Sequence, residues 1–160
     1  MLIRKASPDE AGHAVAIWRE VATWLRDSGR GLWDPSQFLL REAETLAEGG
    51  ELVLGFGGSW PAACMTLQPL DPVFWPEAEG AALYLHKLAV RRPCAGHGWG
   101  VAMIEWAAEE ARRQGVATLR LDCAPRPELV RLYLQNGFRC IDPHPVRLGG
   151  FEVVRFQRQL

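Results

Sequence analysis

The sequence predicts one mixed α/β or α+β domain over residues 1–160, with a central sheet of about seven strands and four helices. Segments with the periodicity of amphipathic helices alternate with short apolar runs, which is typical of folds that pack helices against a sheet. One apolar run, residues 81–90, is almost uninterrupted, as expected of a central strand covered on both faces. A chain of this length buries roughly two thirds of the surface that its unfolded form exposes, so no second domain is needed.

The first third of the chain is predicted to form a strand, over residues 2–6, and two helices. Ser7-Pro8-Asp9-Glu10 begins the first helix with an N-cap residue, a proline and two acids. Side chains at three- and four-residue spacing give it a buried face: Val15, Trp18, Val21, Ala22 and Leu25. The second helix is predicted to begin at Asp34-Pro35-Ser36 and to end at Gly49-Gly50. Its inward side chains are expected to be Phe38, Leu39, Ala43, Leu46 and Ala47.

The rest of the chain is predicted to alternate strands and helices. Two apolar runs, 51–56 and 62–67, predict an antiparallel hairpin, and a loop with three prolines follows over 69–80. After the central strand and a glycine-rich turn, a helix is expected over 101–113, with Ile104, Ala107, Ala108 and Ala111 on one face. A strand over 116–123, a short helix over 127–135 and a final hairpin of 138–141 and 151–156 complete the order.

Composition excludes several classes of function. With 18 basic and 19 acidic residues and a net charge of −1, the chain lacks the basic surplus of nucleic-acid-binding domains. No run approaches the ~20 apolar residues of a membrane span, and the segment 1–5 leads into polar residues rather than a signal-peptide core. We therefore expect no nucleic-acid partner, no membrane association and a cytoplasmic location.

The four cysteines are scattered and show neither C-x-x-C pairs nor the density of a disulfide scaffold. We expect them to be reduced, and we expect no metal. Cys64, Cys123 and Cys140 lie in apolar runs and are predicted to be buried.

The most informative segment, residues 86–100, reads HKLAVRRPCAGHGWG and joins a strand end, a glycine-rich turn and a helix start. Glycines let the backbone approach a ligand, and the N–H groups of the first helical turn point outward at the positive end of the helix dipole. This pattern predicts a site for a pyrophosphate. A G-x-G-x-x-G fingerprint from Gly96 would need glycine where Val101 stands, and no G-x-x-x-x-G-K-[ST] is present, so dinucleotide and P-loop sites are disfavoured.

This segment resembles the acyl-coenzyme A motif of the GNAT N-acetyltransferase superfamily, [Q/R]-x-x-G-x-[G/A]. The matching residues are Ala95, Gly96, His97, Gly98, Trp99 and Gly100, after a strand end of the family's L-x-V type, Leu88, Ala89 and Val90. Ala95 replaces the arginine or glutamine of the motif, and Arg91 or Arg92 is a candidate to supply the missing phosphate contact.

The C-terminal third extends the resemblance. Tyr133 and Gly137-Phe138 match the family's Y-x-x-x-G-F helix end, whereas Pro125-Arg126-Pro127 stands where members often have an asparagine. The resemblance implies the GNAT acyl-CoA N-acyltransferase fold. It also implies transfer of an acetyl group from acetyl-coenzyme A to a primary amine of a small molecule or peptide.

The resemblance also implies roles for particular residues. The cofactor would be held by the backbone of Leu88, Ala89 and Val90, by the turn 95–100 and by Tyr133. Tyr133 matches the family's general acid, and a phenol with an ordinary pKa near ~10 is protonated at neutral pH. His86 shares a strand face with Leu88 and Val90 by period-two alternation, which makes it a candidate general base; a structural, hydrogen-bonded histidine is the alternative.

The acceptor site is expected in the least regular segments. Trp33, Phe74 and Trp75 are candidate walls of an aromatic pocket, and Asp34, Asp71 and Glu77 could attract a cationic amine.

Two other functions stay open at this point: a coenzyme A sensor or interaction module of the same fold with weak or no activity, and a flavodoxin-like nucleotide binder. A homodimer through the edge of the C-terminal hairpin is also possible.

Overall fold

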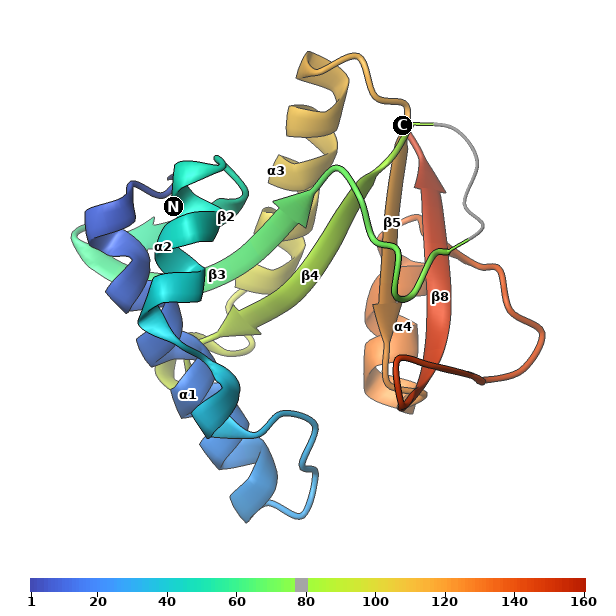
Figure 1. The fold of residues 1–160 in the computed structure, drawn as a ribbon, viewed down its shortest axis with the longest axis horizontal. Helices are drawn as coiled ribbons and strands as arrows, with labels where there is room; N and C mark the ends of the chain where they lie inside the picture. The colour runs from blue at the N-terminus through green and yellow to red at the C-terminus, as the bar shows by residue number, and fades with distance from the viewer. Residues whose placement is uncertain (77–80) are drawn as a thin grey trace. The chain divides into compact units, whose positions relative to one another are not determined.

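The structure, a computed structural model, describes residues 1–76 and 81–160 and confirms the predicted α/β class (Figure 1). The described residues contain four α-helices and eight strands, one strand more than expected. The hydrogen-bonded strand order is β1-β2-β3-β4-β5-β8-β6, and β7 pairs with β8. The chain divides into two compact units: Met1–Leu67 with Lys87–Trp106 (unit 1), and Gln68–His86 with Ala107–Leu160 (unit 2).

Unit 1 contains three strands that pair antiparallel in order: β1 (Leu2–Lys5), β2 (Leu52–Gly57) and β3 (Trp60–Gln68). The end of β4 (Leu83–Val90), the next strand of the sheet, also belongs to this unit. Its helices are α1 (Ala11–Asp27), α2 (Leu40–Glu48) and the first half of α3 (Trp99–Arg113). Three short 3-10 segments, η1 (Pro8–Glu10), η2 (Pro35–Gln37) and η3 (Arg92–Cys94), join these elements.

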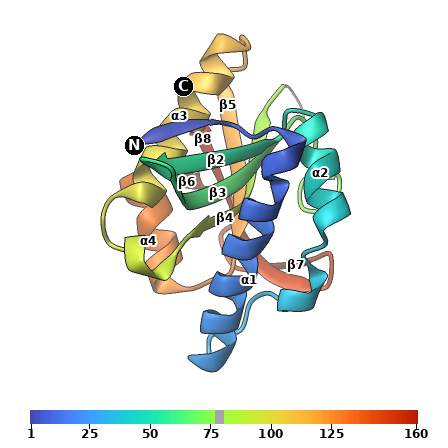
Figure 2. The same ribbon diagram turned by 90° about the vertical axis from the view of Figure 1, so that its left-hand side faces the viewer.

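The alternation of β2 separates two packed faces in unit 1. Leu52, Leu54 and Phe56 lie in one core with buried side chains of α1 and α2. Figure 2 shows these two helices on one face of β2 and β3. Gly55 faces α3, where an added Cβ would lie 3.0 Å from the Trp99 ring and 3.1 Å from Met103 Sδ. The glycine therefore allows α3 to pack closely against the strand.

Unit 2 is built around β5 (Thr118–Cys123). It pairs in parallel with the start of β4 and antiparallel with β8 (Phe151–Gln159) along its whole length. The two-residue strand β6 (Arg139–Cys140) and β7 (Val146–Leu148) both pair antiparallel with β8. Helix α4 (Pro127–Gln135) precedes β6. The core of the unit includes Leu119, Leu121 and Phe156, all fully buried.

Most predicted helix faces are confirmed. The four α3 side chains expected inside are fully buried, and α4 has the predicted bounds. The second helix was predicted to begin too early: Asp34 accepts from the Ser36 amide and caps the separate turn η2, so α2 starts at Leu40. Leu39 precedes the first residue of α2 and is 51% exposed, so the prediction that it faces inward was wrong.

The predicted antiparallel pairing of 138–141 with the last strand is confirmed, because β6 pairs with β8. Two features differ from the predictions. Strand β7 was not expected, and it forms the tight hairpin with β8. Cys140 is exposed, because it lies in the short strand β6, which pairs only with β8 among the described strands. Cys64 and Cys123 are buried as predicted, and all four cysteines are free thiols. In the described part of the chain, no helix combines the length and apolar character that a membrane crossing requires.

Glu10 ties β1 to the start of the first helical segment. Its carboxylate accepts hydrogen bonds of 3.0 Å from both the amide and the hydroxyl of Ser7, and it pairs with Arg4 at 2.6 Å. The bond from Arg4 is the largest cause that lowers the pKa of Glu10 from 4.5 to about 2.

Replacing Glu10 with glutamine is expected to lower the free energy of unfolding by about 1 kcal/mol at pH 7. Because the folded-state pKa of Glu10 is depressed, its ionised carboxylate stabilises the fold fully above about pH 4.5. This contribution is lost as the pH falls toward 2. Urea unfolding at pH 7 and pH 3 should therefore show a smaller difference from the parent protein at pH 3. Asp9→Asn removes a charge from the same turn and should change little. A difference for Glu10→Gln that is equal at both pH values would contradict this account.

Candidate functional site

The turn between β4 and α3 forms an anion-binding shape within unit 1. After η3, residues 95–98 form a turn, and α3 begins at Trp99. The first helical hydrogen bond runs from the Ala102 amide to the Gly98 carbonyl at 3.0 Å. The amides of the three residues before Ala102 therefore lie at the positive N-terminal end of the helix without intrahelical acceptors.

The glycines of this turn are needed for its backbone conformation. Gly96 has a φ of +79° and Gly98 a φ of +80°, values that residues with a Cβ rarely adopt. At Gly96, Gly98 and Gly100, no neighbouring heavy atom lies within 4 Å of the position a Cβ would take. No side chain packs against these positions, so the backbone of the turn is open to an anion such as a diphosphate.

Trp99 anchors this turn to the sheet of unit 1. The side chain is buried, and its indole ring lies against Gly55 and Gly57 of β2. Trp99 can therefore offer a ligand its backbone amide, while its ring belongs to the core. His97 is exposed, and its Nδ1 lies 2.9 Å from the Ala95 carbonyl, which can only accept, so Nδ1 is the donor.

Glu20 on α1 holds the chain that leads into the turn. Its carboxylate accepts from the Arg91 guanidinium and, at 2.9 Å, from the Arg92 amide. Arg91 also donates to the Pro61 carbonyl at 2.8 Å, and the Arg92 guanidinium lies 3.6 Å from the centre of the Trp24 ring. Both guanidiniums therefore already have partners within the protein. That one of them makes the phosphate contact which Ala95 cannot make stays a prediction.

The strand before the turn carries an unusual backbone conformation. Among residues 1–76 and 81–160, Lys87 is the non-glycine residue with a positive φ, at +52°. The Trp18 indole Nε1 donates to the Lys87 carbonyl at 2.7 Å, which holds this residue in place. Leu88, Ala89 and Val90 follow as the last residues of β4. Backbone strain of this kind persists where surrounding contacts enforce it, often at functional sites.

Tyr133 lies in unit 2 on α4, packed among aromatic rings. Its ring centre is 5.8 Å from that of Phe138 and 5.7 Å from that of Phe156. Burial, with smaller contributions from Cys123 and Asp122, raises the pKa of Tyr133 well above its ordinary value. The phenol is therefore protonated at neutral pH, as a general acid must be before it donates its proton.

His86, also in unit 2, lies between two carboxylates. Its Nε2 is 3.4 Å from Asp71 Oδ2, and its Nδ1 is 3.5 Å from Asp122 Oδ1. Asp122 was not a candidate from the sequence. Strands β4 and β5 pair in parallel, with Tyr84 opposite Arg120. His86 and Asp122 each lie two residues further along these strands. Knowledge of this register could have identified Asp122 from the sequence.

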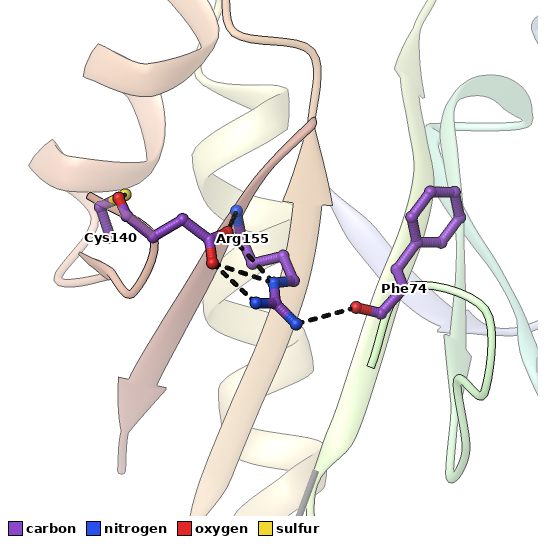
Figure 3. A network of polar contacts seen from close by, with 4 residues as sticks. Phe74, Cys140 and Arg155 are labelled. Atoms are coloured by element: carbon purple, nitrogen blue, oxygen red, sulfur yellow. Dashed lines mark hydrogen bonds and ion pairs between the residues drawn. The ribbon is translucent and has the colours of Figure 1, made fainter. Parts of the chain in front are cut away.

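Phe74 and Trp75 are held by polar contacts within unit 2. Asp71 Oδ1 accepts from the amides of Val73 at 3.2 Å and Phe74 at 3.0 Å. Arg155 donates to the Phe74 carbonyl at 3.3 Å and pairs with the Asp142 carboxylate at 2.7 Å (Figure 3). These contacts fix the turn that carries both aromatic residues.

The predicted aromatic wall is divided between the units. Trp75 is buried, and its ring centre lies 6.0 Å from that of Tyr84. Trp33 belongs to unit 1, where it meets the Phe38 ring edge-on at 5.7 Å. Asp34 caps η2, and the Ser36 amide is the first cause that lowers its pKa. Glu77 lies outside the described residues.

Comparison with known proteins identifies the family. A model of the acetyltransferase (GNAT) family matches residues 18–138, well over half of the chain. The chain belongs to this family. Members of the GNAT family take their acetyl group from acetyl-coenzyme A and use no metal, and a flavodoxin-like nucleotide binder is thereby excluded. This chain is 27% identical over 138 residues to YesJ, an uncharacterized N-acetyltransferase of Bacillus subtilis (strain 168). The aligned region covers 81% of this chain and 77% of YesJ.

Solved structures agree with this GNAT fold. A GNAT acetyltransferase from Listeria monocytogenes 4b F2365 superposes with a TM-score of 0.81 at 26% identity, over 99% of this chain and 94% of that chain. The PaiA N-acetyltransferase of Thermoplasma acidophilum, in complex with coenzyme A, superposes with a TM-score of 0.78 at 13% identity, over 99% of this chain and 98% of that chain. YncA of Salmonella typhimurium, with acetyl-CoA, superposes with a TM-score of 0.76 at 16% identity, over 100% of this chain and 94% of that chain.

Proposed function

We propose that this protein is an N-acetyltransferase that uses acetyl-coenzyme A to acetylate a primary amine of a small molecule or peptide, with residues 1–160 acting as one domain. The observation that carries the proposal is the open glycine turn at the N-terminus of α3, whose backbone suits a diphosphate. Membership of the GNAT family supports the donor. The coenzyme A complexes of the Thermoplasma and Salmonella proteins agree with it.

The residues that would hold the cofactor follow from the turn and from the family motif. The amides at the start of α3 would bind the diphosphate, with Gly96, Gly98 and Gly100 leaving room for it. Leu88, Ala89 and Val90 would offer backbone groups to the pantetheine arm, as the resemblance implies. When bound, acetyl-coenzyme A supplies an activated acetyl thioester.

Tyr133 and His86 are the proposed catalytic residues. Tyr133 donates a proton to the departing thiolate, a role suggested by its match to the family motif and available to it because the phenol is protonated. His86 takes a proton from the protonated amine, so that the nitrogen regains its lone pair and becomes nucleophilic. Trp33, Phe74 and Trp75 are proposed contacts of the acceptor. A cytoplasmic location completes the proposal.

Titration calorimetry with coenzyme A and acetyl-coenzyme A is the direct test. We expect heat of binding with both ligands. Release of free thiol is then measured with polyamines, aminoglycosides, amino acids and peptide N-termini as acceptors, and at least one class should be acetylated. If a folded protein gives no heat with either ligand, the proposal fails.

A coenzyme A-binding module without activity is the second candidate. Ala95 carries no side chain that can contact phosphate, and the Arg91 guanidinium is paired with Glu20, which favours a weakened site. Heat of binding without thiol release from any amine of the panel would support this alternative.

A further inference from the structure

Two carboxylates and an imidazole meet in unit 2, contributed by Asp71, His86 and Asp122. The His86 ring presents Nε2 to Asp71 Oδ2 at 3.4 Å and Nδ1 to Asp122 Oδ1 at 3.5 Å. Both oxygens are buried, and neither has a hydrogen-bond partner among the described residues, His86 included. Buried acceptors without donors are costly, so this arrangement favours a further group that both carboxylates can bind.

The Asp71 carboxylate is held in position from its other side. Its Oδ1 accepts hydrogen bonds from the amides of Val73 at 3.2 Å and Phe74 at 3.0 Å, which leaves Oδ2 directed at the His86 ring. Carboxylates that bind metal ions are commonly oriented by hydrogen bonds of this kind. With a side chain that is only 5% exposed, Asp71 is a fixed acceptor.

The donor set and its charge fit a divalent transition-metal ion. A neutral imidazole and two carboxylates carry two negative charges, which an ion with two positive charges neutralises in this largely buried place. Imidazole nitrogen combined with carboxylate oxygen suits Zn²⁺, whereas Mg²⁺ and Ca²⁺ prefer oxygen ligands alone. Three protein ligands leave one tetrahedral position for water, as in open zinc sites.

The ligand atoms are close enough together to share one ion. One ring nitrogen of His86 and one oxygen of each carboxylate all lie within 4.8 Å of one another. The ligand atoms of a tetrahedral zinc ion lie about 3.4 Å apart, so small side-chain rotations would close the site around it. The side chains of His86 and Asp122 remain 16% and 12% exposed, which leaves an ion a route to them.

We propose that Asp71, His86 and Asp122 bind one Zn²⁺ ion and that the bound ion inhibits the protein. The reaction of the family uses no metal, so the ion acts against it: zinc takes up the imidazole lone pair with which His86 would accept a proton. Asp122 contributes to the raised pKa of Tyr133, so the ion also lies near the proposed general acid. Zinc binding is independent of the proposed function, whereas the inhibition rests on it.

Titration calorimetry with Zn²⁺ in the absence of coenzyme A tests the binding. The protein carries Cys94→Ser and Cys140→Ser, because half-buried and exposed thiols would also bind zinc. We expect one site that is filled at micromolar Zn²⁺, and no heat with Mg²⁺. His86→Gln should abolish this site. His144→Gln changes an exposed histidine of the same unit and should leave the site intact.

The carboxylates are tested separately from the imidazole. Asp71→Asn and Asp122→Asn keep an acceptor oxygen but lose the charge, and each should weaken zinc binding at least tenfold. Co²⁺ in place of Zn²⁺ should give the visible absorption of a four-coordinate ion, and this absorption should be lost in His86→Gln. Absence of saturable heat with Zn²⁺ would overturn the site. Unchanged zinc affinity in the three cluster variants, with native melting temperatures, would overturn it too.

Inhibition is measured on whichever amine of the panel is acetylated. Because zinc also binds the thiol of released coenzyme A, the initial rate of acetylated amine formation is followed by mass spectrometry. Micromolar Zn²⁺ should lower this rate at least tenfold, and EDTA should restore it. Zinc that fills the site without slowing acetylation would overturn the inhibition. If no amine is acetylated even without zinc, the proposed function and the inhibition fail together, whereas the calorimetry still decides the site.

Discussion

Replacing Tyr133 with phenylalanine is expected to lower kcat for acetyl transfer by about 100-fold or more, the range typical of a lost general acid. The substitution removes the hydroxyl and keeps the ring that packs on Phe138 and Phe156, so the fold should be retained. Affinity for acetyl-coenzyme A should change little, because the lost proton transfer occurs in the transition state. Steady-state kinetics, together with calorimetry of coenzyme A binding, measures both quantities.

Tyr84→Phe is the matched control, since Tyr84 is the other tyrosine of the chain. Its hydroxyl accepts from the Arg120 guanidinium at 3.0 Å, and its loss should cost about 1 kcal/mol of stability without a comparable fall in kcat. Unchanged turnover in Tyr133→Phe would remove Tyr133 from the mechanism. A parallel fall in kcat for both variants would indicate a structural effect.

Replacing Gly98 with alanine is expected to raise KM for acetyl-coenzyme A by about tenfold or more. The backbone at Gly98 has a φ of +80°, so a Cβ introduces strain of about 1–2 kcal/mol. The new methyl group would also occupy the open side of the turn, where no neighbouring atom lies within 4 Å. Calorimetry with coenzyme A should show the same loss of affinity.

Gly115→Ala separates strain from ligand contact. Gly115 has a φ of +70°, has equally open surroundings, and follows the C-terminal end of α3. Its substitution should cost similar stability and leave KM unchanged. Equal KM values in the two variants would mean that the turn at Gly98 does not hold the cofactor.

The fold could be predicted closely where local chemistry marks the ends of elements. Pro127 and Gly137 bracket α4, and the spacing of apolar side chains reveals the buried face of α3. Strand β7 was missed because three residues are too few to show alternation. The Gly149-Gly150 pair, both with positive φ, is the hairpin indication that could have revealed it.

The candidate site could be predicted only in part, because several of its contacts join distant segments. The turn 95–100 was evident, since glycine spacing and a helix start are local features. Glu20 contacts Arg91 across 71 positions of sequence, and no local pattern encodes such a pair. Asp122 joins His86 through the register of two parallel strands, which depends on the assembled sheet.

The uneven exposure of the four thiols has a consequence for measuring turnover. Burial raises the pKa of Cys64 far above its ordinary value and that of Cys123 to about 12, so neither forms the thiolate that reacts with disulfide reagents at neutral pH. Cys140 is exposed and Cys94 is half-buried. A chromogenic disulfide that detects released coenzyme A would also titrate the enzyme itself, mainly at Cys140, and Cys140→Ser would give a flatter baseline.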